Sequence, residues 1–395
     1  MQFNKLTKAV LLLLPVFIFL MGCGNTKAGS DITDGLIYDE NDNTWSSGKE
    51  DFQPLVAVMK RECSKSDEIK GTYLLATDDE VIFIGGIGSV ETDGKTKVNA
   101  YTTYEIGSVT KTFTATAVLK LIEEGKIRLD DKVTDYFPEY EKAKDITIYH
   151  LLHMQSGIVR EFIPDDTYQA DIEVWKKYYN DGYSDEQMLE MLYEQDLLFE
   201  PGSEYFYSNV NYSLLTMIIE KVTGESYCEY VKKNIFEPCG MDHSSSMTFG
   251  DVTSVPEPVP EGYYPFDVTE IVPTGYINTP NSWRGTGDIH SCASDMLAFD
   301  RALLGEKIIN SDSLKTMFDM DKGYGCGWQT FSRPGFDGLY YHPGGTPSYI
   351  AANMCYTGTS YGNIYFIYLK PTVLGGESDG ECIENLFTVL KLNVL

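Results

Sequence analysis

The sequence predicts an α/β fold in which a sheet lobe, formed by the N-terminal and C-terminal parts of the chain, carries an inserted lobe of helices. Helical periodicity dominates the middle of the chain, from residue 108 to about 304. Strand-like runs rich in β-branched and aromatic residues lie near both ends, at 72–76, 81–87, 324–331, 349–356 and 363–369. Because strands from both ends share one sheet in such an arrangement, we expect the functional site in the crevice between the two lobes.

The N-terminus resembles a bacterial lipoprotein leader. Lys5 and Lys8 precede an apolar run over 9–21 that is too short to span a membrane, and the four residues that end at Cys23 resemble a lipobox. Cleavage would remove a signal peptide over 1–22 and leave a diacylglycerol on Cys23, whose two acyl chains suffice for stable anchoring. An uncleaved signal anchor is the alternative. We expect a lipid-anchored protein on the extracytoplasmic side of the cell membrane.

The sequence from residue 23 onward predicts a tether followed by one catalytic unit. Residues 23–50 are polar and predict a flexible tether. Residues 51–395 can support a large core and predict a single unit of two lobes, with the helical lobe inserted over about 109–304. A helix over about 51–65 is expected to precede the first strands, and a helical pattern over 383–390 ends the chain.

A nucleophile motif, Ser108-x-x-Lys111, opens the first long helix. Apolar residues recur with a helical period from Phe113 to Ile122, and Gly125 is a natural terminator, so Ser108 begins a helix. Residues at i and i+3 have Cβ atoms about 5–6 Å apart, so the Lys111 amine can reach the Ser108 hydroxyl. Burial pushes an amine toward its neutral, proton-accepting form, and the free N–H groups of the first turn favour an oxyanion there.

A second match to the same pattern is Ser46-Ser-Gly-Lys49. It lies in a polar stretch without apolar periodicity, so no helix start is predicted there. We interpret it as a chance match to a short motif.

Tyr207 and Asn209 form a second motif, on a loop just before a helix. Pro201-Gly202 marks the turn, and apolar residues with a helical period then run to Gly224. A phenol near a Lys ammonium is easier to ionise and can relay a proton between a nucleophile and a leaving group. Taken alone, Tyr207 reads as one of 28 tyrosines, most of them half-buried. The motif therefore carries weight only together with the others.

A third motif, His342-Pro343-Gly344-Gly345, precedes a strand-like run. Glycines let a substrate approach the backbone closely, and a free N–H on Gly345 supplies an oxyanion donor. A lone His is more often structural or solvated, as the spacing of the other four histidines suggests for His150, His153, His243 and His290.

Together the three motifs resemble the serine β-lactamase and penicillin-binding-protein superfamily, in particular the branch of class C β-lactamases, D-Ala-D-Ala carboxypeptidases and related esterases. The resemblance runs from about residue 71 to about 369, and 146–157, 235–241 and 324–328 are similar to framework segments of that branch. It implies the β-lactamase/penicillin-binding-protein fold, with an antiparallel sheet flanked by helices, and a serine hydrolase domain over 51–395. Such motifs are specific for fold and reaction chemistry but not for substrate.

The resemblance implies three catalytic residues and no cofactor or metal. Ser108 would be the acylated nucleophile and Lys111 its activating base. Tyr207 would be the proton shuttle and the deacylation partner.

The substrate-binding residues implied by the resemblance are Asn209, His342, Gly344 and Gly345. Asn209 would hold the substrate's amide carbonyl, and the Gly345 N–H would form the oxyanion pair with that of the serine. His342 and Pro343 stand where relatives that bind β-lactams or terminal D-Ala carry a Lys and a hydroxyl residue, the two groups that bind a carboxylate. We therefore expect neutral esters or internal amide bonds to be preferred over substrates that end in a free carboxylate.

Composition limits the partners. The formal charge of −28 argues against nucleic acid and against anionic lipid bound through a basic face. Once Cys23 is lipidated, seven cysteines remain, an odd number that cannot all pair within one chain, and no Cys/His cluster suggests zinc. We expect a monomer with a small-molecule or peptide substrate. The segments 160–200 and 251–284 are candidates to border the pocket, and surface decoration is the alternative for both.

Three functions remain open from the sequence. The first is a cell-envelope serine amidohydrolase that cleaves peptides, in particular the D-amino-acid peptides of peptidoglycan. The second is an esterase that uses the same machinery on small acyl esters. The third is a non-catalytic penicillin-binding or sensor protein, against which the intact Ser108, Lys111, Tyr207 and Asn209 argue.

Overall fold

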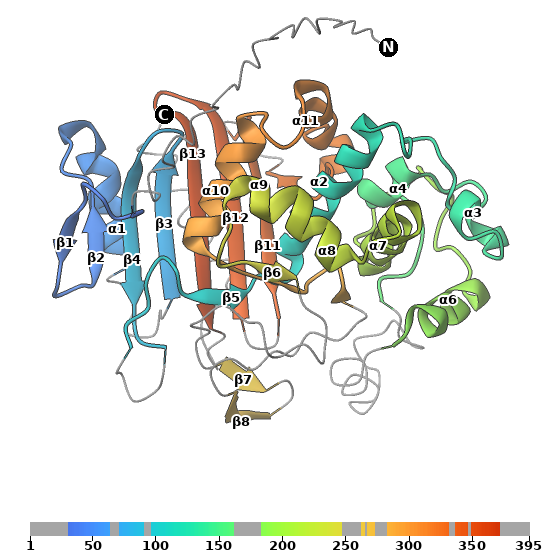
Figure 1. The fold of residues 1–395 in the computed structure, drawn as a ribbon, viewed down its shortest axis with the longest axis horizontal. Helices are drawn as coiled ribbons and strands as arrows, with labels where there is room; N and C mark the ends of the chain where they lie inside the picture. Colours follow the sequence, from blue (N-terminus) through green and yellow to red (C-terminus); the bar gives the residue numbers. More distant parts are fainter. Residues whose placement is uncertain are drawn as a thin grey trace, which may run out of the picture.

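The structure, a computed structural model, describes residues 31–63, 71–90, 96–161, 183–246, 262–264, 267–272, 283–331, 336–346 and 349–371. The predictions for the leader, for Cys23 and for a helix over 383–390 lie outside these residues. A sheet stands on one side of the molecule and a group of helices on the other, as Figure 1 shows.

An eight-stranded antiparallel sheet joins the two ends of the described chain. Its central pair is β3 with β13, in which Leu74 lies opposite Ile367. This pairing confirms that segments far apart in the sequence share one sheet. The strand order is β1 (Ile37–Asp39), β2 (Thr44–Ser46), β4 (Val81–Ile87), β3 (Gly71–Thr77), β13 (Gly362–Pro371), β12 (Tyr349–Thr359), β11 (Leu339–Gly345) and β10 (Gln329–Thr330).

Both faces of this sheet are buried, each by a different layer. Alternate residues along a strand point to opposite faces. Leu75 and Phe366 accordingly pack with helix α1 (Gln53–Cys63), whereas Leu74 and Ile367 belong to the larger core shared with helix α10 (Ala293–Leu304). The near-continuous apolar sequence of these strands follows from burial on both sides.

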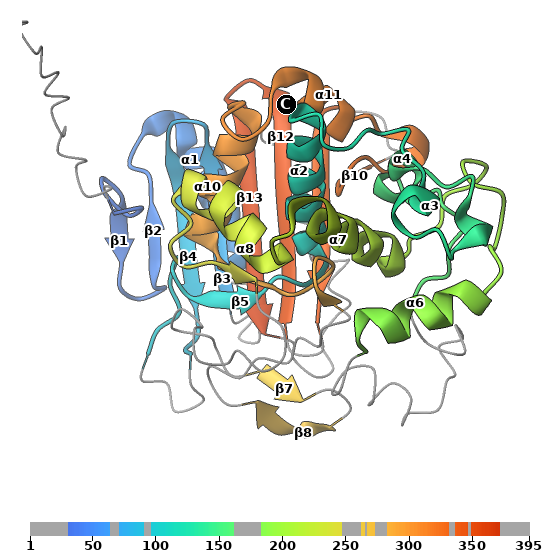
Figure 2. The same ribbon diagram turned by 45° about the vertical axis from the view of Figure 1, so that its right-hand side comes forward.

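Helix α2 (Thr110–Glu123) connects the two lobes. It is almost entirely buried and lies between the sheet and the other helices, as Figure 2 shows. Helix α7 (Asn209–Thr223) packs on both α2 and α4 (Ile148–Leu152). The other α-helices of the described residues are α3 (Val133–Tyr136), α6 (Asp185–Glu194), α8 (Tyr227–Val231), α9 (Glu237–Cys239) and α11 (Ser311–Met317).

A second, three-stranded sheet lies beside the N-terminal end of α2. Its order is β5 (Thr103–Glu105), β9 (Ile289–Cys292) and β6 (Ser245–Ser246). Strand β5 leads directly into the turn that carries the nucleophile motif, so this sheet helps to fix where that turn begins. A separate hairpin pairs β7 (Gly262–Tyr264) with β8 (Asp267–Val272).

The N-terminal segment differs from the prediction of a flexible tether over 23–50. Within it, β1 and β2 extend the large sheet, and β2 pairs with β4. Trp45 packs against the core and Thr44 is buried. Three-residue strands of this kind are stabilised by their tertiary partners, so a polar local composition does not reveal them.

Three further boundaries also differ. His342 to Gly345 lie within β11 rather than ahead of a strand. The sequence does not reveal this, because Pro and Gly have low strand propensity. Of the strand-like run over 324–331, only Gln329–Thr330 forms a strand. Helix α10, expected in the helical lobe, packs on β13 and β3, because a helical period does not say which partner its apolar face covers.

None of the helices within the described residues is long and apolar enough to span a membrane. Within the described residues, five cysteines are free thiols, namely Cys228, Cys239, Cys292, Cys326 and Cys355. No group of three or more His, Cys, Asp or Glu residues is placed to hold a metal ion in the described ranges.

Candidate active site

Ser108 occupies a tight turn between β5 and α2. The turn, Gly107–Val109, is a single 3₁₀ turn that runs into the α-helix, as the sequence predicts for a residue that begins a helix. Gly107 has φ +50°, a left-handed conformation that glycine adopts without strain. Ser108 remains partly exposed while its neighbours on both sides are buried, so its hydroxyl is presented at the start of the helix.

The Lys111 amine lies between Ser108 and a backbone carbonyl. Its Nζ is 3.0 Å from Ser108 Oγ and donates to the carbonyl of Thr286 at 2.8 Å. The side chain is fully buried, and burial lowers the pKa of Lys111 to about 7. A neutral amine in this position can donate to Thr286 and accept the proton of the Ser108 hydroxyl at the same time.

Tyr207 lies beside the amine, on the loop before α7. Its ring centroid is 5.2 Å from Lys111 Nζ, and the Ser108 hydroxyl interacts with its phenol. Burial nevertheless raises the pKa of Tyr207 well above its usual value. The expectation that a nearby ammonium makes this phenol easy to ionise is therefore wrong: desolvation of the phenolate outweighs the nearby positive charge. A neutral phenol is suited to donate a proton.

The end of β11 lies directly against the nucleophile turn. A Cβ on Gly344 would come 1.9 Å from the Ile106 carbonyl oxygen, and a Cβ on Gly107 would come 2.7 Å from the Gly345 nitrogen. Glycine is required at both positions because the two backbones approach so closely. Gly344 and Gly345 therefore lie next to the turn that carries Ser108.

The Gly345 N–H points away from β12. Thr346 N–H donates to the Tyr349 carbonyl at 2.8 Å, and along an antiparallel strand successive N–H groups alternate between the two edges. Among the described residues, β10 covers the outer edge of β11 only at Tyr340 and Tyr341. Gly345 therefore directs its N–H away from β12, and its nitrogen lies against the turn that carries Ser108, where an oxyanion donor is needed.

His342 is buried and held by two protein groups. Nδ1 is 2.7 Å from the Pro343 carbonyl and Nε2 is 3.2 Å from the Tyr324 hydroxyl. A carbonyl only accepts, so Nδ1 carries the proton and Nε2 accepts from Tyr324. Burial, and then the charge of Lys111, lower the pKa of His342 to about 3. The imidazole is thus neutral, and its two nitrogens contact protein, in place of the substrate contact that the sequence suggested.

Asn209 is the first residue of α7, and its two amide atoms differ in environment. Nδ2 donates to Glu161 Oε1 at 2.5 Å, whereas Oδ1 is buried and has no hydrogen-bond partner among the described residues. A carboxylate accepts and does not donate, which fixes this orientation of the amide. The amide nitrogen, which the expected contact with a substrate carbonyl requires, is therefore bonded to Glu161, and the amide oxygen is left without a donor.

The structure adds groups that sequence reasoning missed. Glu161, only 8% exposed, contacts Asn209, and its charge raises the pKa of Lys111 against the effect of burial. Tyr324 fixes the His342 ring. The Thr286 carbonyl holds the lysine amine. Glu161 lies within segment 160–200, which the sequence predicts to border the pocket. The Thr286 carbonyl could not be predicted, because every residue has a backbone carbonyl.

The second Ser-x-x-Lys match has no comparable arrangement. Ser46 is buried in β2, and Lys49 forms an ion pair with Glu80 instead of approaching the serine. Its interpretation as a chance match is confirmed.

A hydroxyl, an amine of lowered pKa and a phenol lie together at the start of α2, an arrangement suited to a serine hydrolase. The family model described as Beta-lactamase matches residues 57–379, and the chain belongs to this family. The predicted superfamily and fold are thereby confirmed.

Individual relatives agree with this assignment. The chain is 31% identical over 265 residues to the putative penicillin-binding protein PbpX of Bacillus subtilis (strain 168), a match that covers 67% of this chain and 62% of that protein. A penicillin-binding protein from Bacillus halodurans has a similar structure, with a TM-score of 0.70 and 21% identity over 85% of this chain and 99% of that one. A D-amino acid amidase from Ochrobactrum anthropi SV3, complexed with D-phenylalanine, gives a TM-score of 0.68 and 20% identity over 87% and 99%.

The chain spans less than two thirds of the length of the first curated relatives that it matches. At 20–21% identity, the similarity to the two solved structures concerns the fold.

Proposed function

We propose that this protein is a cell-envelope hydrolase that forms an acyl-enzyme on Ser108 and cleaves amide bonds of D-amino-acid peptides of the peptidoglycan type. The observation that carries the proposal is the 3.0 Å approach of a buried Lys111 amine to the Ser108 hydroxyl. An amine whose pKa lies near 7 is a base matched to neutral pH.

Proton transfer in the proposed reaction uses the side chains of Ser108, Lys111 and Tyr207. Lys111 accepts the hydroxyl proton as Ser108 Oγ attacks the substrate carbonyl, and the N–H groups of Ser108 and Gly345 receive the oxyanion. Tyr207 donates its proton to the leaving nitrogen and is reprotonated by the Lys111 ammonium. A water molecule then attacks the ester carbonyl, and its proton returns to the serine oxygen through the same groups.

The substrate class is supported by relatives and by the site. Two of the curated relatives are named as penicillin-binding proteins, and structural neighbours include a D-stereospecific amidohydrolase and a D-amino acid amidase. The free Oδ1 of Asn209 matches a peptide N–H on the acyl side of the cleaved bond. Because His342 is neutral and enclosed, the third motif offers no fixed positive charge for a terminal carboxylate.

The pH dependence of kcat/KM distinguishes the role of Lys111 as a base from that of His342 as a neutral group. With Lys111 as the base, kcat/KM should rise with pH through about 7, since only the neutral amine accepts a proton. His342, with its pKa lowered to about 3, keeps the same neutral state at pH 5.5 and at pH 8. The preference between matched peptides with a free and an amidated C-terminus should therefore stay constant, with the amidated peptide favoured.

The control for this experiment is a His342→Lys, Pro343→Thr double variant, which should gain activity toward the free carboxylate. A parent enzyme that favours the free carboxylate at pH 5.5 and loses this preference by pH 8 would show that His342 binds substrate as a cation.

A parallel substrate panel tests the reaction class. The domain is incubated with D-Ala-D-Ala peptides, p-nitrophenyl esters and nitrocefin, and the initial rates are compared. The proposal predicts peptide turnover. Turnover of the esters alone would identify an esterase, and the absence of turnover together with the absence of any covalent adduct would identify a non-catalytic protein.

We further propose that Cys23 anchors the protein to the outer face of the cell membrane. The apolar run before Cys23 and the names of the penicillin-binding relatives support this placement. In cells, Cys23→Ala should move the protein from the membrane fraction to the soluble or uncleaved precursor fraction. Metabolic labelling with a fatty-acid analogue that persists in Cys23→Ala would contradict the anchor.

A further inference from the structure

One loop holds the lysine amine of the proposed reaction. The carbonyl of Thr286 accepts a hydrogen bond from Lys111 Nζ at 2.8 Å. The loop turns sharply at this point: the Thr286 N–H donates to the Trp283 carbonyl at 2.8 Å, and Gly285 has φ +72°. The place of the Thr286 carbonyl therefore depends on how well this turn is fixed.

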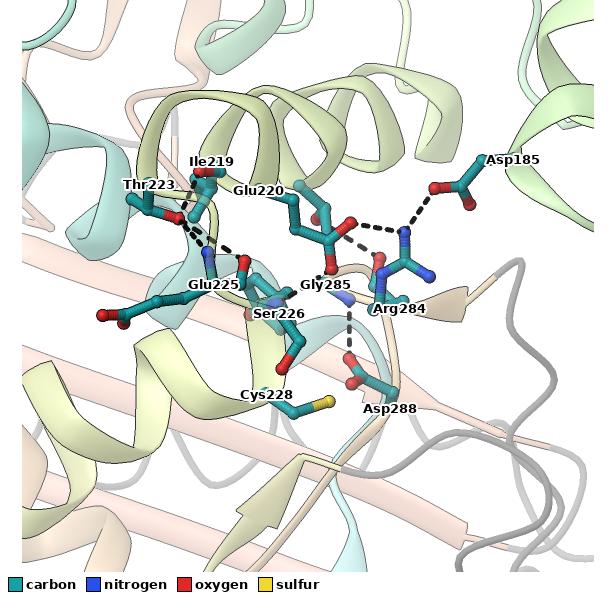
Figure 3. A network of polar contacts seen from close by, with 12 residues as sticks. Asp185, Ile219, Glu220, Thr223, Glu225, Ser226, Cys228, Arg284, Gly285 and Asp288 are labelled. Carbon is teal, nitrogen blue, oxygen red and sulfur yellow. Dashed lines mark hydrogen bonds and ion pairs between the residues drawn. The ribbon is translucent and has the colours of Figure 1, made fainter.

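The Asp288 side chain closes this turn by a hydrogen bond to its backbone. Its Oδ1 accepts from the Gly285 N–H at 2.7 Å, and its Oδ2 accepts from the Ser246 hydroxyl of β6 at 2.5 Å. The residue is completely buried. Figure 3 shows its carboxylate directed toward the backbone of Gly285. One carboxylate oxygen thus closes the turn within the loop, and the other ties the loop to the neighbouring strand β6.

Arg284 fixes the same loop from its other side. Its guanidinium forms ion pairs with Asp185 of α6 at 2.7 Å and with Glu220 of α7 at 3.0 Å, both drawn in Figure 3. The loop is therefore held between two helices by a charged contact and to β6 by a buried carboxylate. The contacts of Arg284 and of Asp288 can influence Lys111 by fixing the position of the Thr286 carbonyl, which accepts from its amine.

Asp288 also acts on Lys111 through its charge. Burial raises the pKa of Asp288 to about 6, so the carboxylate is ionised at neutral pH. Its negative charge raises the pKa of Lys111, against the larger effect of burial. The other groups around Asp288 are Arg284 of its own loop and, from α8, Tyr227 and Cys228, whose pKa values burial raises so that they stay neutral.

We propose that Asp288 is a positioning residue for the reaction at Ser108, because its carboxylate fixes the Thr286 carbonyl that orients the Lys111 amine and places a negative charge near that amine. The inference rests on the proposed function of Ser108 and Lys111. It adds a residue that does not touch the substrate.

The test measures how fast a fluorophosphonate labels Ser108 as a function of pH. Labelling forms a bond from Ser108 Oγ to phosphorus, expels fluoride and passes the hydroxyl proton to Lys111. It therefore reports the protonation of Lys111 without a natural substrate. In the parent, the labelling rate should rise with pH through about 7.

Asp288→Asn removes the charge and keeps both hydrogen bonds, since an amide oxygen accepts from Gly285 and an amide N–H donates to Ser246. The rise in labelling rate should move to lower pH by about half a unit, because loss of a nearby negative charge makes Lys111 easier to deprotonate. A purely structural role would lower the rate without moving the curve.

Asp295→Asn is the matched control. Asp295 is buried, and its Oδ2 accepts from the backbone N–H of His243 and from the Ser244 hydroxyl, both at 2.8 Å, the same two kinds of donor that Asp288 has. It is not among the groups that shift the pKa of Lys111. Its variant should keep the pH curve of the parent.

Coincident pH curves for the parent and Asp288→Asn would overturn the inference. If Asp288→Asn does not fold, Ser246→Ala is the second test. It removes one hydrogen bond to the Asp288 carboxylate and keeps the carboxylate charge, so labelling of Ser108 should slow severalfold. An unchanged labelling rate would contradict the positioning role. Absence of labelling in the parent at every pH would instead overturn the proposed function of Ser108, and the inference with it.

Discussion

Ser108→Ala should abolish turnover of every substrate and all covalent labelling by an active-site phosphonate. Lys111 Nζ contacts the Ser108 hydroxyl, whereas the hydroxyls of Thr110 and Thr112 in the first turn of α2 are buried and hydrogen-bonded to backbone groups. In catalytic units of this kind, loss of one member can cost almost as much as loss of all, so we expect a fall in kcat of at least about 10⁴-fold. The measurement is steady-state turnover together with the mass of the intact protein after labelling.

Ser46→Ala is the control, because Ser46 belongs to the other Ser-x-x-Lys match and lies in a strand. It should label and turn over like the parent. Labelling that survives in Ser108→Ala and disappears in Ser46→Ala would transfer the assignment to the other motif.

Lys111→Ala and Tyr207→Phe should each lower kcat by about 10²–10⁴-fold, the range of a positioned acid or base. The first change removes the only amine within hydrogen-bond distance of the Ser108 hydroxyl in the described structure. The second removes a phenolic proton and little else, because the Tyr207 ring remains to pack against Tyr324 and His342. Thermal unfolding of the Phe variant should follow that of the parent, which separates chemistry from stability.

Full activity in Tyr207→Phe would contradict the proton-donor role. A Lys111→Ala enzyme whose rate still rises with pH through about 7 would show that another group sets that part of the pH profile.

The sequence predicts the elements that depend on local periodicity. The apolar period after Ser108 locates α2 and places the lysine one turn beyond the serine, and the structure brings the two side chains together. The strands of the central sheet are equally visible, since burial on both faces makes them apolar throughout. A combination of three short motifs identifies the superfamily where each alone is ambiguous.

Features that depend on tertiary contacts are not visible in the same way. The protonation of Tyr207 and His342 follows from burial that only the folded chain creates, so a charge argument from sequence gave the wrong direction for the phenol. Thr286 acts through a carbonyl that every residue possesses. Asp288 lies 177 positions after Lys111 and has no motif around it, although it closes the loop that holds the amine.

The most direct test of the account is the site of the covalent intermediate. The parent protein is mixed with a D-amino-acid peptide substrate, quenched in acid during turnover and digested, and the acylated peptide is sequenced by mass spectrometry. The account predicts one acyl group, carried by Ser108 and absent after hydrolysis is complete. An adduct on any other residue, or turnover of the peptide without an acylated enzyme, would contradict it.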